Sequence, residues 1–150
     1  MAKKAPIPVT DCGMAQAIEI LGDRWSLLIL REALYGVTRF DDIRADIGIP
    51  KSVLSQRLGA LVDQGILTKQ MYKEDGKRAR YAYVPTEAGR EFALPLLAIM
   101  QWGDKHVRDN NSRVTMHDSS SGQALSVGLV REDGTSVPLE HLRLKLTAGQ

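Results

Sequence analysis

Two short helical segments separated by a tight break constrain the fold of this chain more than any other feature. Residues 39–46 have a helical pattern, and Gly48-Ile49-Pro50 interrupts it. Pro50 suits the first turn of a new helix, where its missing N–H costs nothing. The new helix covers residues 51–64, and Gly65 follows in the position where a left-handed residue often closes a helix. The spacing predicts two helices joined by a short turn.

The second of these helices has two different sides. Its apolar residues recur at i, i+4, i+7 and i+8, the stripe that packs on a core; they are Leu54, Leu58, Leu61 and Val62. At about 100° per residue, the opposite side is small or polar. It carries Ser52, Gln56, Gly59 and Asp63, flanked by Ser55 and Lys51. Arg57 falls beside the apolar stripe and not on the polar side. We therefore expect it to bind a phosphate or to form an ion pair within the protein.

The pattern changes from helical to alternating after Gly65. Residues 66–72 and 80–84 are rich in β-branched and aromatic side chains, and Asp75-Gly76 between them is a strong hairpin signal. Thr86 can then cap a long helix over residues 87–107, in which Pro95 should produce a kink. The sequence thus predicts a β-hairpin between two helical regions.

The remaining segments complete the predicted organisation. Residues 1–11 are expected to form an N-terminal arm, and helices are expected at 14–21 and 24–35. A second Asp133-Gly134 hairpin signal lies within residues 113–150, which we expect to form a small β-rich extension. Residues 12–112 then form a winged helix-turn-helix with a two-stranded wing and a long C-terminal helix. The fold class is mainly α, of the α+β type.

Positive charge is concentrated in one part of the chain. The net charge is only +2, but residues 51–80 carry seven Lys or Arg against three acidic side chains, and the rest of the chain is net negative. Clustered cations are what phosphate binding requires, because each neutralised phosphate releases a counterion. Such clusters are equally common on solvated faces, so charge alone does not decide between the two interpretations.

Several classes of protein are not supported by the sequence. The longest apolar run, residues 92–100, is shorter than the roughly 20 residues of a membrane span, and no secretory signal follows the N-terminal lysines. The single Cys12 excludes an intramolecular disulfide. His106, His117 and His141 are too scattered for a metal site. No catalytic motif is present, so we expect a cytoplasmic protein that is not an enzyme and has no cofactor.

Residues 12–107 resemble the HxlR-type family of bacterial winged helix-turn-helix regulators. The resemblance is carried by Cys12, Leu21-Gly22-Asp23-Arg24-Trp25, Leu28-Ile29-Leu30, Gly36, Arg39-Phe40, residues 49–61, Gly65, Tyr83, Thr86-Glu87-Ala88-Gly89 and Trp102-Gly103. It implies a homodimer that binds a palindromic operator, with dimer contacts from the first helix and from the helix carrying Trp102. The segment after Arg113 lies outside the resemblance.

For each of three features, the sequence leaves two interpretations open. Cys12 occupies a position where some relatives sense oxidants or electrophiles, but a small, partly buried residue at a dimer interface explains it as well. Trp25, Met100 and Trp102 either line a pocket for a small-molecule effector or anchor the core and the dimer interface. The segment 113–150 either gates such an effector or only enlarges the dimer interface.

The expected function is sequence-specific binding of double-stranded DNA by a homodimer, most simply as a repressor. The helix at 51–64 enters the major groove, and Ser and Gln side chains near its start contact base edges. The alternative is a winged-helix protein-interaction module without DNA binding, which a hydrophobic or acidic helix face would have favoured. The expected DNA-binding residues are Arg39, Lys51, Ser52, Ser55, Gln56, Arg57, Lys73, Lys77, Arg78 and Arg80.

Overall fold

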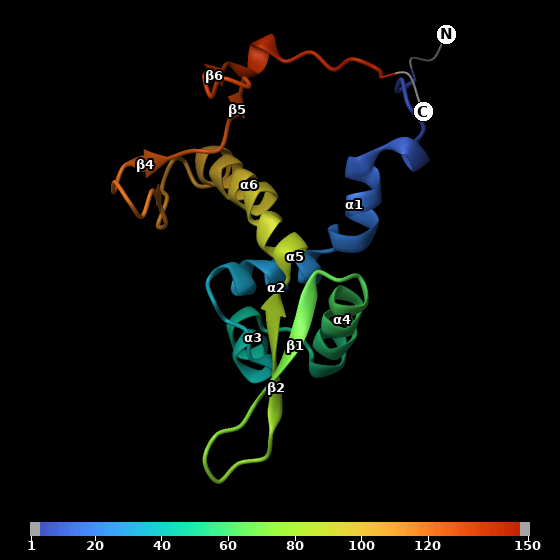
Figure 1. Cartoon of the computed structure of the whole chain (residues 1–150), viewed down its shortest axis with the longest axis vertical. Helices are drawn as coiled ribbons and strands as arrows, with labels where there is room; N and C mark the ends of the chain where they lie inside the picture. Colours follow the sequence, from blue (N-terminus) through green and yellow to red (C-terminus); the bar gives the residue numbers. More distant parts are fainter. Residues whose placement is uncertain (1–3, 148–150) are drawn as a thin grey trace. The chain divides into compact units, whose positions relative to one another are not determined.

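The computed structural model describes residues 4–147, which form two compact units divided between Ala93 and Leu94. Residues 1–3 of the expected N-terminal arm lie outside the described part. The first unit contains a 3₁₀ turn, five α-helices and one β-hairpin, labelled in Figure 1 where there is room. These elements are η1 (Val9–Asp11), α1 (Gly13–Leu21), α2 (Arg24–Leu34), α3 (Phe40–Ile47), α4 (Lys51–Asp63), β1 (Leu67–Tyr72), β2 (Arg80–Pro85) and α5 (Glu87–Glu91).

The core of the first unit lies between α2, α3, α4 and β1. Three of the four residues of the α4 apolar stripe are buried, as their spacing predicts, with Leu54, Leu58 and Leu61 at most 1% exposed, while Val62 is partly exposed. Asp23 caps the start of α2, and its carboxylate accepts hydrogen bonds from the backbone N–H groups of Trp25 and Ser26 at 3.1 Å. The other buried apolar side chains are Leu21, Ile29, Leu30, Ile43, Ile49 and Leu67.

The end of α4 confirms the role predicted for Gly65. Gly65 has φ +72°, its N–H donates to the Val62 carbonyl, and the Ile66 N–H donates to the Leu61 carbonyl. These two bonds satisfy carbonyls that the end of the helix would otherwise leave free. The turn also reverses the chain, so that β1 begins beside the helix it follows.

The β-hairpin forms where the change of pattern predicts it. β1 and β2 pair antiparallel from Leu67 opposite Pro85 to Tyr72 opposite Arg80, which leaves residues 73–79 as the hairpin loop. The backbone before α3 extends this pairing, because the Tyr83 N–H donates to the Thr38 carbonyl at 2.8 Å and Arg39 forms a bridge with Ala82. The hairpin is thereby attached to the start of α3. We call β1, residues 73–79 and β2 the wing.

The helix expected over residues 87–107 is interrupted. Thr86 caps α5 as predicted, with its hydroxyl oxygen accepting a hydrogen bond from the Gly89 N–H. α5 ends at Glu91, Phe92 forms a turn, and α6 covers Ala93–His106. The interruption comes just before Pro95 because a proline ring clashes with the carbonyl four residues earlier, here that of Glu91. The boundary between the two units falls at this interruption, inside the segment 12–112 that the sequence predicts as one domain.

The second unit consists of α6 and the β-rich segment that follows it. β3 (Met116–His117) pairs with β4 (Ala124–Leu125), and β5 (Leu129–Val130) pairs with β6 (Ser136–Val137) before the 3₁₀ turn η2 (Leu139–His141). The Gln101 side chain donates to the Val127 carbonyl and accepts from its N–H, both at 2.9 Å. The predicted β-rich character is confirmed, but each strand is only two residues long. None of residues 94–147 is fully buried.

One ionisable side chain lies in the core of the first unit. Glu32 of α2 is 2% exposed and pairs with Arg31, whose side chain is half exposed. Burial raises the pKa of Glu32 and the nearby Asp46 carboxylate adds to the effect, while Arg31 opposes it. Ionised Glu32 is therefore less favourable in the folded chain than in the unfolded chain.

Glu32→Gln is expected to change the pH dependence of stability. Because the folded pKa is raised, the contribution of Glu32 to stability is greatest below its unfolded pKa of about 4.5 and is lost as the pH rises through the folded value. The variant should be more stable than the wild type by about 1 kcal/mol at pH 7, with a smaller difference at pH 4. Urea unfolding at both pH values measures this. Glu19→Gln on exposed α1 is the control, and an equal gain there would contradict the explanation.

Candidate nucleic-acid interface

The exposed side of α4 is polar, and its side chains form no hydrogen bond or ion pair within residues 4–147. Ser52, Ser55 and Gln56 are exposed near the start of the helix, and none of them forms a side-chain hydrogen bond within residues 4–147. Lys51 lies beside them and forms no ion pair in the same range. Hydroxyl and amide groups of this kind can hydrogen-bond base edges in a major groove. The buried leucines fix the orientation of the helix, so these groups all face outward.

Arg57 is held within the protein. Its Nε lies 3.4 Å from Asp23 Oδ1, and both side chains are about one-third exposed. Burial acts to raise the pKa of Asp23, but hydrogen bonds from Ser26 and the charge of Arg57 outweigh it and lower that pKa. The arginine therefore connects α4 to the capping residue of α2. This is one of the two assignments that the sequence allowed.

The wing loop contains an acidic residue that binds two of the predicted DNA-contacting cations. Glu74 accepts from Lys77 Nζ and from Arg39 Nη1, each at 2.6 Å. The hydrogen bond and charge of Lys77, followed by those of Arg39, lower the pKa of Glu74. Arg39 also stacks on the ring of Tyr72, with its guanidinium carbon 4.4 Å from the ring centroid. Arg39 and Lys77 are thus both paired in the DNA-free protein.

A second ion pair connects the wing to α3. Arg80 Nη1 donates to Asp41 Oδ2 at 2.7 Å, and both side chains are more than half exposed. Lys69, Lys73 and Arg78 form no ion pair within residues 4–147, so the wing retains three cations without an acidic partner. The sequence gives no sign of these acidic partners, because Arg39 and Glu74 are 35 residues apart and Arg80 and Asp41 are 39 apart.

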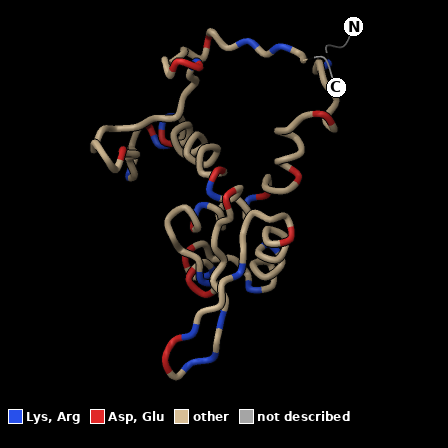
Figure 2. Tube along the Cα trace, in the orientation of Figure 1, with Lys and Arg blue, Asp and Glu red and all other residues tan. Residues whose placement is uncertain are grey.

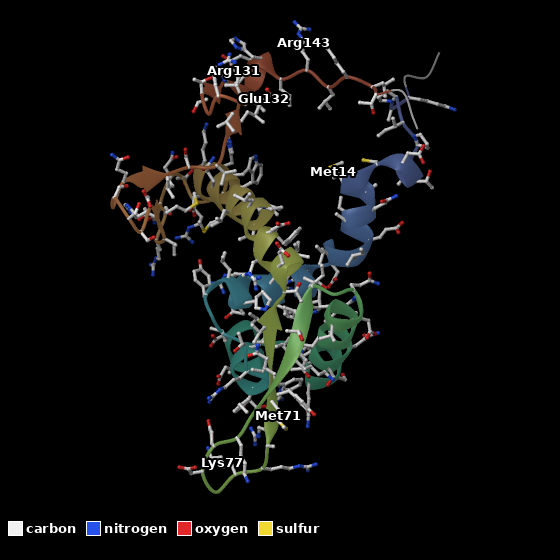
Figure 3. All side chains as sticks on the ribbon, in the orientation of Figure 1. Met14, Met71, Lys77, Arg131, Glu132 and Arg143 are labelled. Atoms are coloured by element: carbon white, nitrogen blue, oxygen red, sulfur yellow. The ribbon has the colours of Figure 1, made fainter. Side chains whose placement is uncertain are left out.

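The figures show how charge is arranged on the wing. Lys and Arg lie along both arms of the hairpin in Figure 2, and a short acidic stretch lies on one side of the loop. Figure 3 labels Lys77 in the loop and Met71 in the stem. Met71 is 71% exposed and pairs across the hairpin with Tyr81, which is half exposed. The wing therefore offers both cations and an apolar surface.

The possible sensor and effector residues are divided between the two units. Cys12 is half buried and occupies the position before the first residue of α1, where its side chain makes no capping hydrogen bond. Trp25 of α2 is partly exposed beneath the Arg24 guanidinium. In the second unit, Trp102 is 61% exposed, and Met100 lines an open cleft of about 390 Å³ with Val114 and Leu125. Cys12 and Trp25 thus belong to the first unit, whereas Met100 and Trp102 belong to the second.

Residues 4–147 contain no group of three or more His, Cys, Asp or Glu side chains placed to hold a metal ion. No helix in the same range is long and apolar enough to span a bilayer.

The comparison with protein families identifies the fold and its class. Residues 20–111 match the model described as an HxlR-like helix-turn-helix. The chain belongs to the HxlR-like helix-turn-helix family. Members of this family and the curated relatives are transcriptional regulators of the helix-turn-helix type and not enzymes. The winged helix-turn-helix predicted from the sequence, with its mixture of helices and small antiparallel strand pairs, is therefore confirmed.

Related sequences and solved structures agree with this assignment. The uncharacterised HTH-type regulator Rv3095 of Mycobacterium tuberculosis is 43% identical over 94 residues, which are 63% of this chain and 58% of the relative. YdeP of Bacillus subtilis is 26% identical over 63% of this chain and 73% of its own length. This HxlR-like chain thus spans just over half the length of the mycobacterial relatives it matches.

Among solved structures, the candidate transcription factor PA1607 has a TM-score of 0.74 and 31% identity, over 90% of this chain and 94% of its own. PA1374 from Pseudomonas aeruginosa has a TM-score of 0.62 and 35% identity, over 93% and 94%. Because these matches cover nine-tenths of the HxlR-like chain, they extend beyond residues 20–111 into the β-rich segment. That segment is therefore shared with other candidate transcription factors.

Proposed function

We propose that this HxlR-like regulator binds double-stranded DNA sequence-specifically as a homodimer and represses transcription from a palindromic operator. The observation that carries the proposal is the exposed side of α4. Ser52, Ser55 and Gln56 are free to bond with bases, and the buried leucines on the other side hold the helix in place. The free cations Lys51, Lys73 and Arg78 would bind phosphates on either side of the groove. A protein-interaction module, the alternative, would not need this polar surface.

Dimerisation is supported by apolar side chains that the single chain leaves exposed. Met14 and Ile18 of α1 are 71% and 57% exposed, and Leu94, Ile99 and Trp102 of α6 are 55–64% exposed. Exposed apolar groups at helical spacing usually mark an interface. A two-fold dimer places two copies of α4 in successive major grooves, which accounts for a palindromic operator.

Signal input would act through the same interface in this proposal. Cys12 lies directly before the first residue of α1, and we place it in the dimer contact rather than assign it a separate sensor role. An oxidant, an electrophile or a small molecule that altered this contact would change the spacing of the two α4 helices. Regulation would then take place on DNA in the cytoplasm.

The proposal is tested by selecting duplexes from a random pool and measuring affinity by fluorescence anisotropy at several salt concentrations. A palindromic duplex should bind more tightly than a single half-site or a scrambled duplex, with a steep salt dependence. Binding to no duplex, or binding without salt dependence, would favour the protein-interaction module. Equal binding to a half-site and to the palindrome would contradict the dimeric mode.

Arg78→Ala is expected to weaken binding to the operator and to a scrambled duplex by the same factor. Arg78 has no acidic partner within residues 4–147, so its charge is available to a phosphate, and a phosphate contact carries no sequence information. Removing one such contact from each of the two protomers should reduce the salt slope of the dimer by about 1.8. Arg143→Ala, which removes an exposed arginine of the second unit, is the control. A loss confined to the operator would mean that Arg78 contacts a base.

A further inference from the structure

A groove of about 480 Å³ lies between the start of α4 and the base of the wing, entirely within the first unit. It has the side chains needed to bind an anion. Two cations line it, Lys51 and Arg80, and neither Lys51 nor the Ser55 hydroxyl has a side-chain partner in the described chain. Tyr72 and Tyr81 are lining residues as well, and the Tyr72 hydroxyl also forms no hydrogen bond within residues 4–147.

The same groove contains an internal anion. Asp41, at the start of α3, lines it and accepts the hydrogen bond from Arg80 at 2.7 Å. The Arg80 and Asp41 side chains are 57% and 64% exposed, so water competes for both groups. Exposed pairs of this kind contribute little to stability and exchange readily. A phosphate that enters the groove can therefore displace the Asp41 carboxylate without disturbing the core.

We infer that this groove binds a backbone phosphate of the bound DNA, and that the Asp41 carboxylate pairs with Arg80 until that phosphate replaces it. The inference rests on the proposed DNA binding and adds a specific contact to it. Lys51 and Arg80 would neutralise the phosphate, while the Ser55 and Tyr72 hydroxyls would donate hydrogen bonds to its oxygens. Asp41 is then a competitor that lowers affinity for every DNA sequence by the same factor.

The wing loop repeats this arrangement next to the groove. Glu74 accepts from Arg39 and Lys77 at 2.6 Å, and all three side chains are at least one-third exposed. Tyr72 belongs to both places, because its ring lines the groove and also lies under the Arg39 guanidinium. With Arg57 paired to Asp23, four of the cations that the sequence assigns to DNA are thus paired with carboxylates before DNA arrives.

The test compares Asp41→Asn with Asp42→Asn. Both substitutions remove one negative charge from the first turn of α3, but Asp42 forms no ion pair within residues 4–147. Asp41→Asn should bind the selected operator and a scrambled duplex about two- to five-fold more tightly than Asp42→Asn does, the range that an exposed ion pair contributes. The salt slope should be unchanged, because Arg80 contacts a phosphate in both proteins.

Arg80→Gln completes the experiment. It should weaken binding and reduce the salt slope of the dimer by about 1.8, because each of the two protomers loses one phosphate contact. Combined with Arg80→Gln, the Asp41→Asn substitution should improve binding no more than Asp42→Asn does. Thermal unfolding of each variant establishes that the first unit is folded before binding is measured.

Three results would overturn the inference. If Asp41→Asn binds DNA no more tightly than Asp42→Asn does, the Arg80–Asp41 ion pair only positions the wing. A salt slope that steepens by about 1.8 in the Asp41→Asn dimer would mean that Arg80 stays with Asp41 in the wild-type complex. If Arg80→Gln has the affinity and salt slope of the wild type, Arg80 does not contact a phosphate. If the wild type binds no duplex, the proposed function fails, whereas normal wild-type binding with unaffected variants removes only this inference.

Discussion

Gln56→Ala is expected to weaken binding to the operator by about 1–3 kcal/mol and to leave binding to a scrambled duplex nearly unchanged. Gln56 is exposed on α4 and has no hydrogen bond within residues 4–147, so its whole amide is available to a base. Glutamine typically donates to N7 and accepts from N6 of adenine in the major groove, and alanine can do neither. The ratio of the two affinities, measured at one salt concentration, is the quantity that decides.

Gln64→Ala is the matched control for this substitution. Gln64 is also exposed, but it is the capping residue at the far end of α4. A helix that enters the groove by its first turns leaves this end away from the bases, so the variant should bind like the wild type. If Gln56→Ala weakens both duplexes equally, Gln56 contacts the backbone and not a base. If only Gln64→Ala weakens operator binding, α4 enters the groove in the opposite direction.

Gly89→Ala is expected to destabilise the first unit by about 3 kcal/mol, near the upper end for overpacking a close contact. A Cβ added to Gly89 would overlap the Ile66 carbonyl oxygen and approach Pro85 Cβ to 3.2 Å. The same carbonyl accepts hydrogen bonds from the Thr86 N–H and hydroxyl, both at 3.0 Å. The backbone therefore has no free direction in which to move. Thermal unfolding should show a midpoint lower by about 10 °C or more.

Gly59→Ala is the control for this prediction, because it is the same chemical change in another helix. No atom lies within 4 Å of a Cβ added to Gly59. Alanine should stabilise that helix by about 0.5–1 kcal/mol, since it restricts the unfolded chain more than glycine does. Equal effects of the two substitutions would show that the contact between α5 and the turn before β1 is not tight. A stable Gly89→Ala protein would show the same.

The parts of the fold that local sequence determines could be predicted from it. The α4 stripe, the Gly65 turn, the wing strands and the Thr86 cap follow from residues within a few positions of one another. The interruption at Phe92 was predicted only as a kink at Pro95, because a proline affects the carbonyl four residues earlier as well as its own position. The two-residue strands after residue 113 were too short for an alternating pattern to give their limits.

The candidate site was predicted only in part, for a physical reason. The outward position of Ser52, Ser55 and Gln56 follows from helical geometry once the leucines are placed inward. Which cations of the wing are paired with carboxylates does not follow from helical geometry. The partners of Arg39 and Arg80 are distant in sequence and are brought close by the pairing of Tyr83 with Thr38. Composition gives the number of cations, but only the fold gives how many remain free.

The absence of a fully buried residue among residues 94–147 has a consequence for how the proposed dimer would respond to its own abundance. A segment that buries its apolar side chains only against a second chain gains its order by association, so its stability rises with protein concentration. Occupancy of an operator that requires the dimer would then depend on roughly the second power of the monomer concentration. A rise in synthesis of the regulator would then change the occupancy of its target promoter more steeply than it would for a regulator that binds as a monomer.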